Sequence, residues 1–260
     1  SDMSARVADS ALRVPHSRVR ELAEIAMFMD SSARSQESRV LRLYFGESNF
    51  PTPDYIKRAA VEALESGYTF YTENAGLPSL RHALARHYQR LQGVTLDPES
   101  EIVITASGVQ ALCVGIRATL DPGDEAVILT PAWPNGSSIV GMSNAVPRHV
   151  PHTLAGDRFQ IDFDALEAAV TARTKLLIYT SPSNPLGWVA TVDDQRRLLD
   201  FARKHGLWLL ADEVYDRLYY GGAHPGDPVP SILRLAGRED ALLVVQSFSK
   251  AYCMTGWRVG

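Results

Sequence analysis

The chain has 260 residues, of which 45% are hydrophobic and 22% are charged, as is usual for a globular protein with a buried core. Its formal net charge of -4 argues against a nucleic-acid or anionic-membrane partner, because such partners require a clustered positive surface. Cys113 and Cys253 are too few for a disulfide framework or a thiolate zinc site, and no stretch approaches the roughly 20 apolar residues of a membrane span. We therefore expect a cytoplasmic protein without a metal site.

The N-terminal region is expected to lie outside the main core. Apolar residues recur at helical spacing over residues 13–29, and residues 31–37 form a polar linker. We therefore divide the chain into an N-terminal arm and helix, residues 1–45, and a main domain, residues 46–260.

From residue 101 onward, short apolar strands alternate with helices. Strands are expected at residues 102–105, 126–129, 175–180, 207–211 and 242–246, and helices at residues 109–120, 163–172 and 193–205. This order is typical of an α/β fold with a mostly parallel sheet covered by helices on both faces. Ligands bind beyond the carboxyl ends of the strands in such sheets, so candidate site residues are sought there.

Lys250 follows the last apolar strand, residues 242–245, and is one of four lysines in a chain that is otherwise rich in arginine. Lys57, Lys175 and Lys204 have ordinary surface explanations in charged helical patterns or at the end of an element. A lysine at the end of a buried strand can form a Schiff base with a carbonyl cofactor. Lys250 is therefore the first candidate for a catalytic residue.

Ser107, Gly108 and Val109 begin the helix that follows the strand expected at residues 102–105. Free backbone amides and the helix dipole favour an anion at such a position, although an ordinary capped helix explains the same residues. Two hydroxyls and a guanidinium suit a phosphate dianion, because arginine donates bidentate charge-assisted bonds. Near Lys250 these groups are Ser247, Ser249 and Arg258.

Three further polar residues follow expected strands. Asp212 closes the strand at residues 207–211, and Tyr215 comes three residues later. Asn184 lies in a loop whose prolines favour a rigid, extended course. An acid at a strand end can also cap the next helix, so Asp212 alone leaves both interpretations open.

Together these motifs resemble the class I/II pyridoxal-phosphate-dependent aminotransferases, the family related to aspartate aminotransferase, of fold type I. The resemblance runs in the family's order through residues 45–53, 68–81, 107–110, 181–187, 211–215 and 247–258. It departs from the family at Ser48, where proline is usual, and at Leu186, where threonine is frequent. The family also continues beyond residue 260 into a C-terminal small domain, so we expect this chain to lack that domain and to be an incomplete large domain, poorly soluble or inactive in isolation.

The resemblance implies a role for each residue around pyridoxal 5'-phosphate. Lys250 holds the cofactor as a Schiff base, an internal aldimine, and Asp212 binds the pyridine nitrogen. Asn184 and Tyr215 bind the ring hydroxyl. The phosphate lies among Ser107, Gly108, Val109, Ser247, Ser249 and Arg258.

Three aromatic or glycine positions complete the implied site. Trp133 stacks on the pyridine ring, although an aromatic residue after a strand also suits a core. Tyr71 reaches the phosphate of a neighbouring subunit, which implies a homodimer. Gly46 approaches the substrate carboxylate, beside Asn184.

The implied activity is transfer of an amino group between an L-amino acid and a 2-oxo acid by a ping-pong mechanism. A carbon-sulfur β-lyase or a cyclopropane-forming synthase on the same fold remains an alternative, because a shared site does not fix the reaction. A non-catalytic regulator that binds the cofactor is a second alternative, but no helix-turn-helix or basic segment precedes Arg42. A nucleotide-dependent Rossmann enzyme is a third, and the chain lacks its glycine fingerprint.

Overall fold

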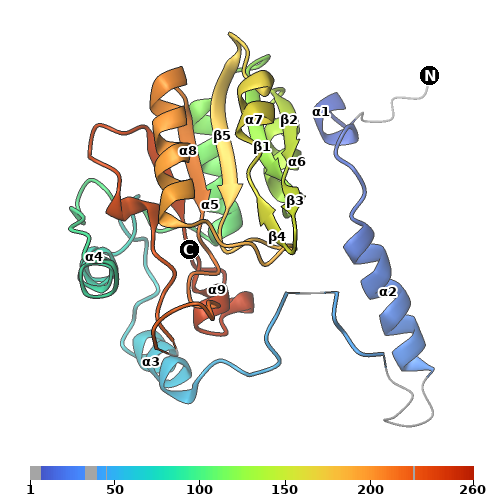
Figure 1. The fold of residues 1–260 in the computed structure, drawn as a ribbon. Helices are drawn as coiled ribbons and strands as arrows, with labels where there is room; N and C mark the ends of the chain where they lie inside the picture. The colour runs from blue at the N-terminus through green and yellow to red at the C-terminus, as the bar shows by residue number, and fades with distance from the viewer. Residues whose placement is uncertain (1–6, 33–39, 45, 225) are drawn as a thin grey trace, which may run out of the picture.

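A five-stranded sheet forms the centre of the computed structural model, which describes residues 7–32, 40–44, 46–224 and 226–260. The strand order is β2-β1-β5-β6-β7, and every neighbouring pair is parallel (Figure 1). The sheet strands are β1 (Glu125–Thr130), β2 (Val146–Pro151), β5 (Thr174–Thr180), β6 (Trp208–Asp212) and β7 (Leu242–Val245). A separate antiparallel hairpin pairs β3 (Thr153–Ala155) with β4 (Arg158–Gln160). The mostly parallel α/β fold is thereby confirmed.

The central strands are buried on both faces. In β1, Val127 and Leu129 belong to one apolar cluster, and Ala126 and Ile128 belong to another. Successive side chains in a strand point to opposite faces, so the two clusters are the two sides of the sheet. This double burial explains why the strands read as continuous apolar runs.

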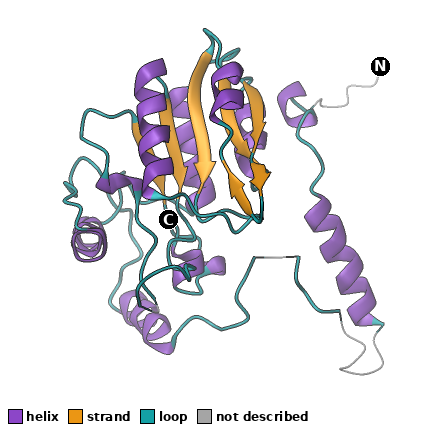
Figure 2. Ribbon diagram, viewed as in Figure 1, coloured by secondary structure: helices purple, strands orange, loops and turns teal. Residues whose placement is uncertain are grey.

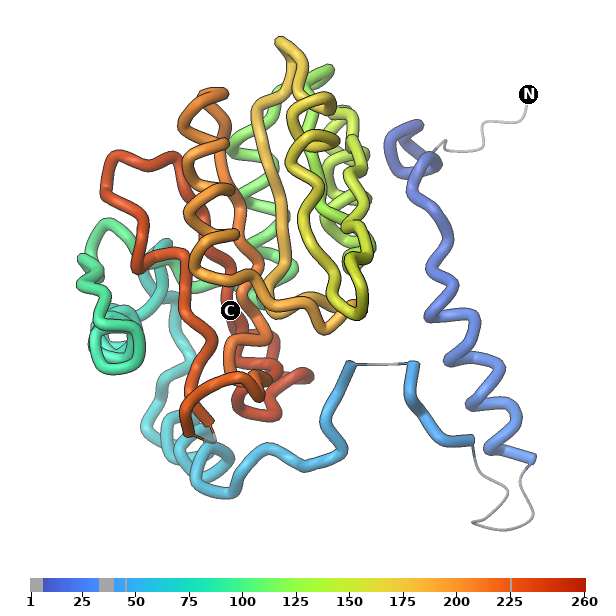
Figure 3. Tube along the Cα trace, in the orientation of Figure 1, coloured from blue at the N-terminus to red at the C-terminus, as the bar shows by residue number. Residues whose placement is uncertain are grey.

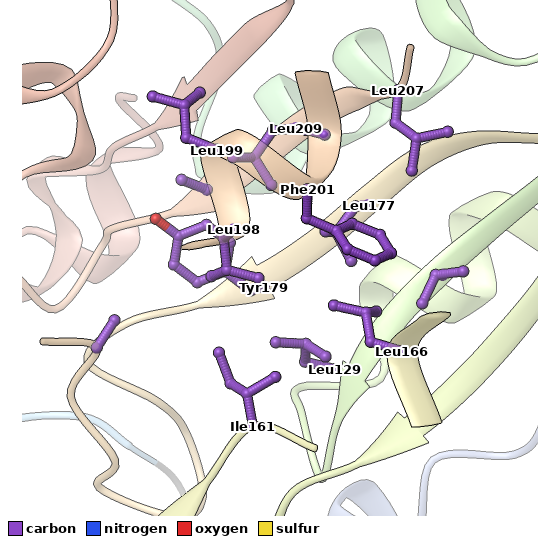
Figure 4. Packing of buried hydrophobic residues seen from close by; sticks show 14 of the residues in the cluster. Leu129, Ile161, Leu166, Leu177, Tyr179, Leu198, Leu199, Phe201, Leu207 and Leu209 are labelled. Atoms are coloured by element: carbon purple, nitrogen blue, oxygen red, sulfur yellow. The ribbon is translucent and has the colours of Figure 1, made fainter. Parts of the chain in front are cut away.

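Helices cover both faces (Figure 2). α5 (Gly108–Thr119) and α6 (Asn135–Met142) pack on the face of Ile128, whereas α7 (Phe163–Ala169) and α8 (Val192–His205) pack on the face of Leu129. Figure 4 shows side chains from α7, α8, β1, β5 and β6 packed together in the cluster that contains Leu129. α8 starts sharply, because Thr191 and Asp194 form a reciprocal capping box.

The N-terminal helices run beside the main body (Figure 3). They are α1 (Asp9–Leu12) and α2 (Arg18–Ser31), and Arg13 donates a hydrogen bond of 3.1 Å to the Asn144 side chain next to α6. The linker predicted at residues 31–37 falls largely on residues 33–39, which lie outside the described residues. The remaining helices are α3 (Asp54–Glu65), α4 (Pro78–Gln92), α9 (Phe248–Ala251) and the 3-10 turns η2 (Ile232–Arg234) and η3 (Thr255–Trp257).

The predicted and observed strands differ at residues 102–105 and at β2. Residues 102–105 form no strand, because their backbone bonds go singly to other segments: Ile104 N–H donates to Ala75, and Thr105 exchanges two bonds with Gly260. Conversely, β2 is a strand that the apolar pattern did not predict, because it contains two prolines. β2 is an edge strand, where a missing N–H removes no ladder bond on the open side.

Across the part of the chain that the structure describes, no helix has the length and apolar character needed to cross a bilayer.

Candidate active site

The carboxyl ends of β5, β6 and β7 lie side by side. Thr180 pairs with Asp212, and Asp212 pairs with Val245, so the three strands end at the same level. The chain leaves these ends through the loop that carries Asn184, through residues 213–215, and through Ser247 into the short helix α9. This edge of the sheet faces α9 (Figure 1), and it collects most of the predicted site residues.

Lys250 lies at the centre of a cluster drawn from four distant parts of the chain. Its Nζ donates to the backbone oxygen of Gly46 and lies 5.6 Å from the centre of the Tyr215 ring. The side-chain amide of Asn184 donates a hydrogen bond of 3.1 Å to the Tyr215 hydroxyl. A Cβ built on Gly46 would lie 3.6 Å from that hydroxyl and 3.8 Å from the Asn184 amide nitrogen. Gly46, Asn184 and Tyr215, all predicted site residues, therefore gather beside the Lys250 amine.

The environment of Lys250 favours its neutral form. Burial lowers the pKa of the Lys250 ammonium, the Glu47 carboxylate opposes this effect, and the Arg258 guanidinium reinforces it. A lysine with a lowered pKa is a better nucleophile near neutral pH, because a larger fraction carries a free lone pair.

Asp212 is a buried acid, and no cationic side chain among the described residues pairs with it. Its side chain is 8% exposed and accepts one hydrogen bond of 3.3 Å from the Val214 N–H. Burial raises the pKa of Asp212 to about 6, and the Val214 bond only partly offsets that rise. Asp212 lines a small pocket together with Trp133 and Leu112. A cationic N–H entering this pocket would find an acceptor and would stabilise the ionised carboxylate.

The Tyr215 hydroxyl accepts a hydrogen bond from Asn184 and keeps its own proton for another partner. Burial raises the pKa of Tyr215, while the Asn184 amide lowers it and the charge of Asp212 raises it. Because Asn184 already donates to the Tyr215 oxygen, the hydroxyl proton is free to point toward a ligand.

A set of small polar residues surrounds the start of α5. Ser107 caps the helix by accepting from the Gln110 N–H, and its φ of 102° turns the backbone sharply. A Cβ on Gly108 would lie 3.4 Å from the Ser247 Cβ, which places the helix N-terminus against the segment that carries Lys250. The Ser247 and Ser249 hydroxyls are 2.8 Å apart. Backbone amides and hydroxyls thus gather as an anion site requires.

Arg258 and Val109 lie at the margin of this set. The Arg258 side chain is exposed and donates to the Thr255 backbone oxygen, and its φ of 57° is left-handed. The positive charge of Arg258 helps to lower the pKa of Lys250. Val109 contributes its backbone position in the first turn of α5, and its side chain is 41% exposed.

Two predicted aromatic residues have different surroundings. Trp133 lines the Asp212 pocket and is 39% exposed, so one part of its indole is open to a ligand. Tyr71 is fully exposed, and its predicted contact with a neighbouring subunit stays a prediction.

Both departures from the family pattern have local structural partners. The Ser48 hydroxyl accepts a bond of 3.1 Å from the Phe50 N–H and so stabilises a turn where proline is usual. Leu186 packs against the apolar cluster beneath the Asn184 loop.

The sequence interpretation overlooked Glu47 as part of this site. Glu47 follows Gly46, and its carboxylate accepts a hydrogen bond from the Thr255 hydroxyl. The sequence did offer a signal for Glu47, because it is an acidic residue directly after Gly46, which was expected to lie near the substrate.

A parallel sheet whose polar residues gather at its carboxyl edge, beside a helix N-terminus, defines an α/β enzyme of the kind that binds a phosphorylated cofactor. Residues 38–260 match the family described as aminotransferase class I and II. The chain belongs to this family.

Named relatives agree with this assignment. The chain is 35% identical, over 99% of its length, to a putative aminotransferase, YugH, of Bacillus subtilis, and 38% identical over 88% to a probable aspartate/prephenate aminotransferase of Thermus aquaticus. The structure resembles that of an aspartate aminotransferase mutant from Thermus thermophilus, with a TM-score of 0.87 and 34% identity, covering 99% of this chain and 64% of that one. The chain spans 63% and 59% of the length of the two curated relatives.

Class I and II aminotransferases depend on pyridoxal 5'-phosphate, and the residues of this chain fit that group. Asp212 is a buried acid that lacks a cationic partner among the described residues, and a protonated pyridine nitrogen would supply one. The serines and the α5 N-terminus suit a phosphate, and Lys250 offers an amine with a lowered pKa.

Proposed function

We propose that this chain carries the cofactor-binding domain of an aminotransferase that moves an amino group between an L-amino acid and a 2-oxo acid. The observation that carries the proposal is the meeting of Lys250, Asn184, Tyr215 and Gly46 at the carboxyl edge of the sheet, beside the buried Asp212. The division into an N-terminal arm, residues 1–45, and a cofactor-binding domain, residues 46–260, is part of the same proposal.

The bound cofactor supplies an electron sink that stabilises negative charge at the substrate α-carbon. Asp212 would keep the ring nitrogen protonated, which is the condition for that sink. Asn184 and Tyr215 would orient the ring through its hydroxyl, and Trp133 would fix its plane. Ser107, Gly108, Val109, Ser247, Ser249 and Arg258 would hold the phosphate.

Lys250 has two roles in this scheme. Its neutral Nζ would hold the cofactor covalently through the carbonyl carbon, whose oxygen would leave as water. As a free amine, the same nitrogen would take the proton from the substrate α-carbon and carry it as an ammonium until the proton is returned. The lowered pKa of Lys250 supports both roles, because each needs the lone pair.

We further propose a homodimer in the cytoplasm. The full exposure of Tyr71 supports an assembly in which this side chain reaches the phosphate of a neighbouring site. Gly46, beside Asn184, would approach the substrate carboxylate.

The test is a pair of half-reactions on the cofactor-loaded protein. An amino donor should change the visible absorbance stoichiometrically, and a 2-oxo acid should restore it, with the acceptor aminated. Release of ammonia or a sulfide without recovery of the spectrum by an oxo acid would contradict amino transfer and favour a lyase.

A further inference from the structure

Three hydrogen bonds join two segments that are about two hundred residues apart in the sequence. The Thr255 hydroxyl donates to the Glu47 carboxylate, the Thr52 hydroxyl donates to the Cys253 backbone oxygen across 2.6 Å, and the Trp257 indole donates to the Thr52 oxygen across 3.0 Å. We call residues 46–52 and 253–257, together with these bonds, the loop clamp. A cavity of about 490 Å³ lies between its two segments.

The loop clamp is attached directly to the catalytic amine. Gly46, its first residue, accepts a hydrogen bond from Lys250 Nζ, and Glu47 follows at once. The second segment begins three residues after Lys250. The clamp therefore joins Glu47, the neighbour of Gly46, to the backbone segment that follows Lys250.

The charged and titratable groups around Lys250 come from three elements. Glu47 comes from the first clamp segment, Arg258 follows the second, and Tyr215 follows β6. Arg258 disfavours positive charge on Nζ, and burial acts in the same direction. Glu47 is the group among them that favours such charge.

We propose that Glu47 is a positioning residue for the amino-transfer reaction, whose carboxylate, oriented by Thr255, holds positive charge on the Lys250 nitrogen while that nitrogen is joined to the cofactor. This inference rests on the proposed function. A protonated nitrogen makes the attached carbon more electrophilic, so Glu47 prepares the cofactor for attack by the substrate amine without touching the substrate.

The position of Glu47 suits this role better than a purely structural one. Its side chain is largely exposed, so the Thr255 bond adds little to folding stability. The same bond matters for orientation, because an untethered carboxylate at the surface would sample many rotamers.

The experiment is a pH titration of the visible absorbance of the cofactor-loaded protein. Glu47→Gln removes the charge and keeps the shape of the side chain. Its absorbance midpoint should fall by about half to one pH unit, the Coulomb effect expected of one carboxylate in a partly solvated site. Glu47→Asp keeps the charge, so its midpoint should stay closer to that of the wild type.

Thr52→Val is the matched control, because it removes the two bonds at the other end of the loop clamp and changes no charge. Its midpoint should stay within about a tenth of a pH unit of the wild type if charge is the cause. An unmoved midpoint in Glu47→Gln, or an equal shift in Thr52→Val, would overturn the inference alone. A wild-type protein that shows no cofactor band would overturn the proposed function as well.

Discussion

Asp212 and Glu213 are consecutive, and their side chains occupy opposite faces of the sheet. Asp212 lines the pocket that holds Trp133, whereas Glu213 accepts a bond of 2.9 Å from the Ile232 N–H in the opposite apolar cluster. Burial raises the pKa of Asp212 to about 6 and that of Glu213 to about 7. Asp212 lines the candidate site, whereas Glu213 binds the first residue of η2, next to the segment that Gln92 and Gln195 bind.

Asp212 should lower the stability of the cofactor-free protein at neutral pH. Its pKa is raised from 3.8 to about 6, so the folded state binds a proton more tightly than the unfolded state does. Stability is therefore lost as pH rises from about 4 to 6. Asp212→Asn is neutral throughout, and it should raise the free energy of unfolding at pH 7.5 by about 2 kcal/mol.

Urea unfolding of the cofactor-free protein at pH 7.5 and pH 4 measures this effect. The gain should largely vanish at pH 4, and Asp157→Asn, on an exposed turn, should change neither value. A variant that is equally or less stable than the wild type at pH 7.5 would show that the carboxylate is stabilised by a contact other than the Val214 bond.

Removal of the Tyr215 hydroxyl should weaken cofactor binding. Tyr215→Phe loses the oxygen that Asn184 orients and the proton that would face the cofactor. The dissociation constant for pyridoxal 5'-phosphate should rise about fivefold to tenfold, the usual size of one hydrogen bond. Tyr220→Phe is the control, because that side chain is 97% exposed. Equal affinities for the two variants would argue against a role for Tyr215 at the cofactor.

Glu125 should stabilise the amino edge of the sheet. It is fully buried and accepts bonds from Arg148, Arg173 and Thr171. The hydrogen bond from Arg148, with those from Thr171 and Arg173, lowers the pKa of Glu125 to about 2. Burial alone would raise this pKa, so the hydrogen bonds outweigh it. Glu125→Gln should lower the free energy of unfolding by about 2 kcal/mol at pH 7. Breaking a fully buried ion pair would cost more, but here both arginines are partly exposed.

The sign of the pH dependence provides a second check on Glu125. A lowered pKa gives stability that is present above pH 4.5 and is lost as pH falls toward 2, so the difference between variant and wild type should shrink over that range. Asp54→Asn breaks an exposed pair with Lys57 and should leave the urea midpoint unchanged. A difference that is constant from pH 7 to pH 3 would contradict the linkage.

Gly76 and Gly67 form a matched pair for testing close packing. Both have a positive φ, +92° and +82°, so alanine strains the backbone at each. A Cβ on Gly76 would lie 2.5 Å from the Ile104 Cβ, whereas Gly67 has nothing within 4 Å. In thermal unfolding, Gly67→Ala should lower the free energy of unfolding by about 1 kcal/mol, and Gly76→Ala by about 2 to 4 kcal/mol. Equal losses of stability would show that residues 102–105 move aside for the Gly76→Ala side chain without destabilising the protein.

Much of the fold could be predicted from the sequence, because doubly buried strands are continuous apolar runs. The pattern failed where a strand lay at the edge, as in β2 with its prolines, and where an extended segment bonds to single residues, as at 102–105. Local patterns carry no information about such long-range partners.

The site was predictable at the strand ends and less so around them. Lys250, Asp212 and Asn184 follow apolar strands, and the parallel register brings them to one edge. Glu47 could not be assigned in the same way, since its contact with Thr255 depends on how a segment 208 residues away folds back over the sheet.

The most direct test of the account is borohydride reduction of the protein after incubation with pyridoxal 5'-phosphate, followed by peptide mass spectrometry. We predict one stable cofactor adduct per chain, on Lys250, and no visible band or adduct in Lys250→Ala. An adduct spread over Lys57, Lys175 and Lys204, or a colourless protein that ignores the cofactor, would contradict the assignment of Lys250 as the catalytic amine.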